Sequence, residues 1–132
     1  MQNIIDNFKN NQILVLVDVC YGGQFVIQGA RKRGDDIYSD VGDAEYISEK
    51  LKLKTRIVLT SGSLNVVPDG LEKNFSPFAK RLLQALYDGG GEQGYLTSMD
   101  LFRCIELLPS KPMWGELPSN HPGAEFILQK QR

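Results

Sequence analysis

Two short apolar runs, each followed by small or polar residues, constrain the fold of this chain more than any other feature. Residues 13–17 read ILVLV before Asp18, and residues 55–60 read TRIVLT before Ser61. Continuous β-branched and aliphatic runs of this length are typical of strands buried on both faces of a parallel sheet. The strand at 13–18 is therefore expected to have a neighbouring strand on each side.

Helical patterns alternate with these runs. Helices are expected at 2–9, 44–53, 77–88 and from Thr97 to Leu108, and a last strand is expected at 124–128. Strands that alternate with helices indicate an α/β sheet with helices on both faces. Three strands make a thin sheet, so half of the fold is expected to be absent or to come from another chain.

Two of these helices carry clear end signals. Ser76 is expected to cap the third helix, with Pro77 at its first position and glycines from Gly89 ending it. Its expected buried stripe consists of Phe75, Phe78, Leu82 and Leu86. The next helix is expected to begin with a capping box made by Thr97 and Asp100.

Composition excludes several classes of protein. The 132 residues are enough for one domain at most, and 15 basic against 16 acidic residues give no basic stripe for nucleic acid. No apolar run is long enough to span a membrane, and the first residues do not resemble a secretory signal. With two cysteines, a cytoplasmic, reduced protein without metal or cofactor is expected.

The strand ends direct attention to Cys20. Ligands of open α/β sheets bind beyond the carboxyl ends of the strands, where Cys20 and Ser61 are expected to border one crevice. Gly22 and Gly23 allow close backbone approach, and the Cys20 N–H could help to bind an oxyanion. On position alone, inert packing is the more common role of such a cysteine. Cys104, beside Ile105 in a helical segment, is expected to lie in the core.

Several segments, in order, resemble the caspase-like cysteine peptidases, the family of caspases, paracaspases and metacaspases. LVDVCYGGQF is similar to their nucleophile segment, and IVLTSGSLNVVPDG to the next strand and its substrate-binding loop. SPFAKRLLQAL and GYLTSMDLFRCIE resemble the two following helices, and KPMWGELPSNHPGAEFIL the closing loop and strand. The resemblance covers residues 12–128.

This resemblance implies the C-terminal half of a three-layer caspase-like sandwich, with a mostly parallel sheet and helices on both faces. Residues 12–28 would be the nucleophile segment, 29–43 an exposed processing-type loop, and 44–132 the part that resembles the small subunit. The chain departs from the family at two places. The caspase signature Gln-Ala-Cys-x-Gly is absent, and the family's Gly-His before Ser-Pro-Phe is Asn74-Phe75 here.

The resemblance also implies a cysteine endopeptidase with Cys20 as its nucleophile. Asp18 stands where caspases have a Gln in the pocket for an acidic residue, so cleavage after Arg or Lys is expected instead. The alternative is that Asp18 caps a loop N–H. Asp69 is a weaker candidate for the same pocket, and a plain turn is its simpler explanation.

The basic residues Arg31, Lys32 and Arg33 would be a self-cleavage site under this hypothesis, or a solvated loop under the simpler one. A phosphate-binding loop at the two glycines is a weak alternative, because the spacing and lysine of a P-loop are missing. The acidic residues of the loop match no calcium-ligand pattern of the family.

The catalytic base is missing from the expected place. In this family it is a His about fifty residues before the Cys, whereas only nineteen residues precede Cys20 and none is His. The lone His121 is expected to be a solvent-exposed loop residue and not the base. The base is therefore expected from a missing N-terminal half or a partner chain. The competing hypothesis is a non-catalytic interaction module.

Overall fold

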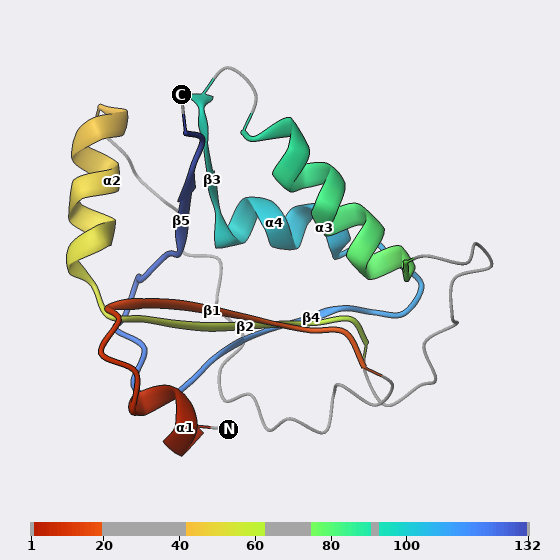
Figure 1. Ribbon diagram of the computed structural model, residues 1–132, viewed down its shortest axis with the longest axis horizontal. Helices are drawn as coiled ribbons and strands as arrows, with labels where there is room; N and C mark the ends of the chain where they lie inside the picture. The colour runs from red at the N-terminus through yellow and green to blue at the C-terminus, as the bar shows by residue number, and fades with distance from the viewer. Residues whose placement is uncertain (1, 20–41, 63–74, 91–92, 132) are drawn as a thin grey trace.

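The computed structural model describes residues 2–19, 42–62, 75–90 and 93–131 of the chain. Their helices and strands, in chain order, are α1 (Gln2–Asp6), β1 (Gln12–Val17), α2 (Asp43–Lys52), β2 (Thr55–Thr60), α3 (Pro77–Asp88), β3 (Tyr95–Thr97), α4 (Ser98–Ile105), β4 (Met113–Glu116) and β5 (Ile127–Gln129). They form a mixed α/β arrangement with a small mixed sheet (Figure 1).

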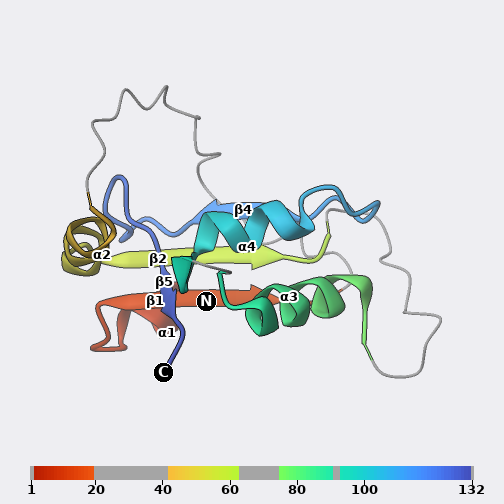
Figure 2. The same cartoon turned by 90° about the horizontal axis from the view of Figure 1, so that it is seen from above.

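The main sheet has the strand order β1-β2-β4 (Figure 2). β1 and β2 are parallel, in a register that runs from Gln12 opposite Thr55 to Val17 opposite Thr60. β4 is antiparallel to β2, and β3 and β5 form a separate antiparallel pair. The expectation of a mostly parallel sheet therefore holds only for β1 and β2.

β2, and not β1, is the central strand of the described sheet. Every residue of β2 is buried, whereas β1 is half-buried and its Leu16 is 43% exposed. Among the described residues β1 pairs with β2 alone, so the expectation of neighbours on both sides of 13–18 is not met. β2 lies between β1 and β4 and is covered by apolar side chains on both faces, which accounts for its burial.

Helices pack on both faces of this sheet (Figure 1). On one face, Ile57 and Leu59 pack with the apolar sides of α3 and α4, represented by Phe78 and Leu101. On the other face, Val58 packs with Ile5 of α1 and with Leu117. Alternate residues of β2 thus point to opposite faces, as the pleat of a strand requires.

The end signals of α3 are confirmed, but its buried stripe is not the one expected. The Ser76 hydroxyl accepts a hydrogen bond from the Ala79 N–H at 3.0 Å, and Gly89 ends the helix with φ 61°. Phe78, Leu82 and Ala85 are buried, whereas Phe75 and Leu86 are 59% and 40% exposed. Phe75 precedes the cap, so the helix does not turn its side chain toward the core.

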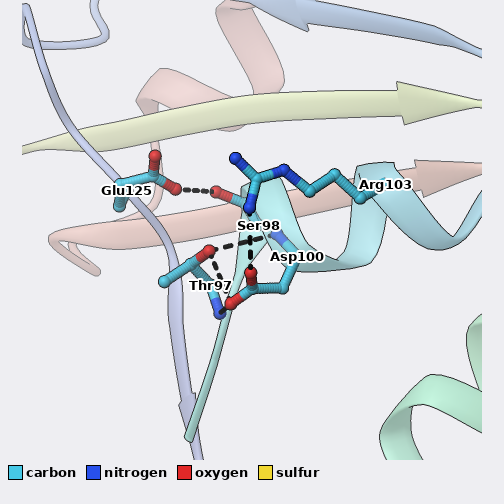
Figure 3. Close-up of polar contacts among 5 residues, drawn as sticks. All are labelled: Thr97, Ser98, Asp100, Arg103 and Glu125. Carbon is cyan, nitrogen blue, oxygen red and sulfur yellow. Dashed lines mark hydrogen bonds and ion pairs between the residues drawn. The ribbon is translucent and has the colours of Figure 1, made fainter. Parts of the chain in front are cut away.

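The expected capping box of α4 is confirmed (Figure 3). Thr97 Oγ1 accepts from the Asp100 N–H at 3.1 Å, and the Asp100 carboxylate accepts from the Thr97 N–H at 2.9 Å. The helix ends at Ile105, three residues earlier than expected. Leu101 and Ile105 enter the core and Cys104 is exposed, so the prediction that Cys104 lies in the core is wrong.

The pattern analysis missed β3 and β4 and placed the last strand too early. β5 begins at Ile127, and the buried residues Ala124 and Glu125 precede it outside any strand. The Ser98 hydroxyl donates to the Glu125 carboxylate at 2.8 Å (Figure 3). The same hydroxyl accepts from the Phe126 N–H. These bonds join the approach to β5 with the start of α4. In the described segments, no helix has the length and apolar character needed to cross a membrane.

Candidate functional site

The carboxyl ends of β1 and β2 are joined by Ser61. Its N–H donates to the Val17 carbonyl at 2.9 Å, and its hydroxyl accepts from the Val19 N–H at 3.1 Å. The same hydroxyl is 3.3 Å from the Val19 carbonyl oxygen, to which it donates. Ser61 is fully buried. Ser61 therefore holds the backbone of Val19, the residue before Cys20. Its position beside a substrate crevice stays a prediction.

Asp18 lies one residue past β1, at the same edge of the sheet. Its carboxylate accepts a hydrogen bond of 2.5 Å from the hydroxyl of Ser76, the residue that caps α3. Asp18 is exposed, unlike the buried carboxylate on which the specificity argument depends. Its described partner is a side-chain hydroxyl and not the loop N–H of the alternative interpretation. The sequence analysis identified Ser76 as a cap but missed this contact, because nothing in the local pattern joins residues 58 positions apart.

Exposed apolar side chains accompany Asp18 at this edge. Leu16 and Val19 are 43% and 44% exposed, and Phe75, next to the Asp18 partner Ser76, is 59% exposed. Among the described residues, this edge of the sheet therefore carries the Asp18 carboxylate together with exposed apolar side chains. Such a surface suits a ligand that carries a cation next to apolar groups.

The remaining predicted site residues lie outside the described residues. These are the nucleophile candidate Cys20, the second pocket candidate Asp69, and the basic residues Arg31, Lys32 and Arg33. Their roles stay predictions. Val19, which lies at the carboxyl end of β1, is the described residue nearest to Cys20 in the chain.

His121 lies at the opposite end of β2. Its Nδ1 accepts from the Lys54 N–H at 3.1 Å, and its own N–H donates to the Lys54 carbonyl at 2.8 Å. A strand rises about 3.3 Å per residue, so the length of β2 separates Lys54 from Ser61 by about 20 Å. His121 is therefore too far from Val19 to act as a base for the residue that follows it.

Cys104 is a free and exposed thiol on α4. Its partial burial, and next the negative charge of Asp100, raise the pKa of this thiol. A raised pKa leaves less of the nucleophilic thiolate at neutral pH. The surroundings of Cys104 therefore oppose a catalytic role.

Within the part of the chain that the structure describes, no three His, Cys, Asp or Glu side chains gather as metal ligands would. No family model matches the chain. No curated protein and no solved structure matches it either.

Proposed function

We propose that this chain is the C-terminal half of a caspase-like cysteine endopeptidase domain, a three-layer sandwich when complete, that cleaves after Arg or Lys. The observation that supports it most is the meeting of Asp18, Ser61 and Ser76 at one edge of the sheet. These residues come from the three segments that the resemblance relates to the nucleophile strand, the substrate-binding loop and the following helix. These three residues are far apart in sequence and lie at one edge in the structure, and this proximity is what supports the proposal.

The proposed reaction is acyl transfer to Cys20. The base takes the proton of the Cys20 thiol, the resulting thiolate attacks the carbonyl carbon of the peptide, and the Cys20 N–H binds the oxyanion that forms. The C–N bond then breaks, the leaving amine takes a proton from the base, and water hydrolyses the thioester to release the acid. The lone His121 lies at the far end of β2, so the base in this proposal is a His from outside this chain.

Asp18 is the proposed partner of the substrate cation. An exposed ion pair contributes only about 0–1 kcal/mol, whereas a pair shielded from water contributes more when its hydrogen bonds are complete. Because Asp18 is exposed in the described structure, the isolated chain should prefer basic substrates only modestly. If the rest of the domain shielded this edge from water, the preference for Arg or Lys would become stronger. A second carboxylate from Asp69 would have the same effect in this proposal.

The proposed partner is the missing N-terminal half or another chain, and the open edge of β1 supports it. Asn11 and Val17 accept hydrogen bonds from β2, so the alternation of a parallel ladder turns the backbone groups of Leu14 and Leu16 to the other edge. No described residue pairs with β1 there. Unpaired edges of apolar strands favour the addition of a further strand. The same edge favours the alternative function, a non-catalytic interaction module.

A peptide ending in an arginyl electrophilic ketone tests this proposal. The full chain is treated at about pH 8.5, where an ordinary thiol is half ionised without a base, and modification is located by peptide mass spectrometry. Matched probes ending in Leu and Asp are the controls, together with Cys20→Ala, Cys104→Ala and Asp18→Asn. We expect the Arg probe to modify Cys20 faster than either control probe, and Asp18→Asn to remove the difference.

Equal modification of Cys20 by the three probes would contradict the basic specificity. Modification of Cys104 in preference to Cys20 would contradict the choice of nucleophile and favour the interaction module.

Self-cleavage is tested by the intact mass of the chain after incubation with a completed domain. Loss of cleavage in the triple variant Arg31→Gln, Lys32→Gln, Arg33→Gln would support processing in the 29–43 loop, and an active uncut enzyme would exclude it. In this proposal the protein works in the cytoplasm, where its thiol stays reduced.

A further inference from the structure

Ser76 is bonded on two sides through one hydroxyl. The oxygen accepts from the Ala79 N–H at 3.0 Å, which caps α3, and the O–H donates to the Asp18 carboxylate at 2.5 Å. A hydroxyl has one hydrogen to donate and two lone pairs to accept, so both bonds form at once. The start of α3 is thereby fixed to the residue that follows β1.

Two features of the start of α3 act on the Asp18 carboxylate: the hydrogen bond from the Ser76 hydroxyl and the dipole of the helix. The hydrogen bond from Ser76 fixes one oxygen, Oδ2, and the other oxygen accepts no hydrogen bond from the residues that the structure describes. The first turn of α3 adds the positive end of its helix dipole, which favours a negative charge near the cap. An exposed aspartate would otherwise sample several rotamers, and a ligand that binds it would lose free energy in ordering it.

We propose that Ser76 is a positioning residue, which holds the Asp18 carboxylate in the orientation that receives the guanidinium of a basic substrate. This inference rests on the proposed function, because it assigns Ser76 a part in the specificity of that same site. It adds a residue of the α3 cap to the pocket, and it links recognition of the substrate to the packing of α3 on the sheet.

Three variants of Ser76 separate its two bonds. Ser76→Ala removes the cap and the donor, whereas Ser76→Gly removes the donor but preserves most of the capping, since glycine is well tolerated at this position. Ser76→Thr preserves both. Ser119→Ala is the matched control, because the Ser119 hydroxyl donates to the Asp6 carboxylate at the same 2.5 Å, away from the carboxyl ends of the strands.

The experiment compares the inactivation of Cys20 by the Arg probe and the Leu probe in each variant. Saturation kinetics separate the apparent binding constant KI from the maximal rate kinact. We expect Ser76→Ala and Ser76→Gly to raise KI for the Arg probe by about two- to threefold, because the lost bond only orders the carboxylate and the exposed ion pair itself contributes at most about 1 kcal/mol. Their kinact values, and KI for the Leu probe, should stay at the wild-type values. Ser76→Thr and Ser119→Ala should match the wild type throughout.

The outcomes distinguish the two levels of the inference. If the wild type does not prefer the Arg probe, the proposed function and the role of Ser76 both fail. If the wild type prefers it and Ser76→Gly does so equally, the proposed function stands and the positioning role is overturned. If only Ser76→Ala loses the preference, the cap of α3 and not the bond to Asp18 is responsible, and the positioning role is again overturned.

Discussion

The two ends of the β1–β2 pair use their polar groups in opposite ways. At the amino end, the guanidinium of Arg56 is 1% exposed and donates to the carbonyl oxygens of Asn10, Asn11 and Thr55 at 2.8–3.0 Å. Asn120 accepts from the Arg56 N–H at 2.7 Å. The polar groups of this end therefore bind the backbone of the chain itself.

At the carboxyl end, the contacts are made by short side chains and leave more of the surface open. Ser61 and Ser76 fix Val19 and Asp18, while the Asp18 carboxylate and the side chains of Val19 and Phe75 stay exposed. The amino end therefore stabilises the fold, whereas a role of the carboxyl end in holding residues for a ligand is the proposal made above.

The largest effect is expected from Arg56→Ala at the amino end. The substitution removes the buried donors of the Asn10, Asn11 and Thr55 carbonyls and leaves a cavity, so the free energy of unfolding should fall by about 3 kcal/mol. Urea denaturation measures it. Arg103→Ala is the control, since this exposed arginine has only a 3.8 Å ion pair with Asp100 and should change stability by less than about 0.5 kcal/mol. Equal effects of the two variants would contradict the stabilising role of this end.

Ser61→Ala is expected to have the next largest effect on stability, and it acts at the carboxyl end. It leaves the Val19 N–H without its described partner, which should lower the free energy of unfolding by about 1–2 kcal/mol. The loosened backbone should also slow the reaction of Cys20 with the Arg probe. Ser48→Ala, at an exposed position of α2, should alter neither quantity. A loss of stability without any slowing at Cys20 would mean that Ser61 does not position the nucleophile segment.

His121→Ala should affect only the amino end. It removes an exposed hydrogen bond with the Lys54 N–H, and we expect a loss of about 0.5–1 kcal/mol in the free energy of unfolding. The rate at which the Arg probe modifies Cys20 should not change, because the length of β2 separates His121 from Val19, the described residue before Cys20. A tenfold slower rate, measured at equal folded fraction, would reinstate His121 as a candidate base.

The smallest effect is expected at Cys104, away from both ends. Its pKa is raised in the folded chain, so the unfolded chain loses this proton first as the pH rises through the usual thiol pKa near 8.5. The Cys104 contribution to stability should therefore fall slightly above that pH and be unchanged below it. Alkylation of Cys104 by iodoacetamide, followed by peptide mass, should begin at higher pH in the folded chain than in urea. Superimposed pH profiles would contradict this.

The local signals predicted the helix ends better than the sheet. Ser76, Pro77 and Gly89 delimit α3 as expected, because capping and glycine geometry depend on neighbours in sequence. β3 and β4 are three and four residues long and were missed, because so few residues carry no period. Of the candidate site, the sequence predicted only that the carboxyl ends of two strands lie at one crevice. Its contact between Asp18 and Ser76 depends on how α3 packs on the sheet.

By itself, the sequence determined where the chain forms β1, β2, α3 and α4, since β-branched runs, caps and helical spacing act over a few residues. It also determined that one histidine is present and where the acid and the thiol follow a strand. Only the tertiary structure decided that β2 is central in the described sheet and that β1 pairs there with β2 alone. It also decided that Asp18 meets Ser76 while His121 lies at the far end of β2. The reason is physical: strand order and burial come from the packing of segments distant in sequence, and a local hydropathy pattern does not encode which neighbour a strand will find.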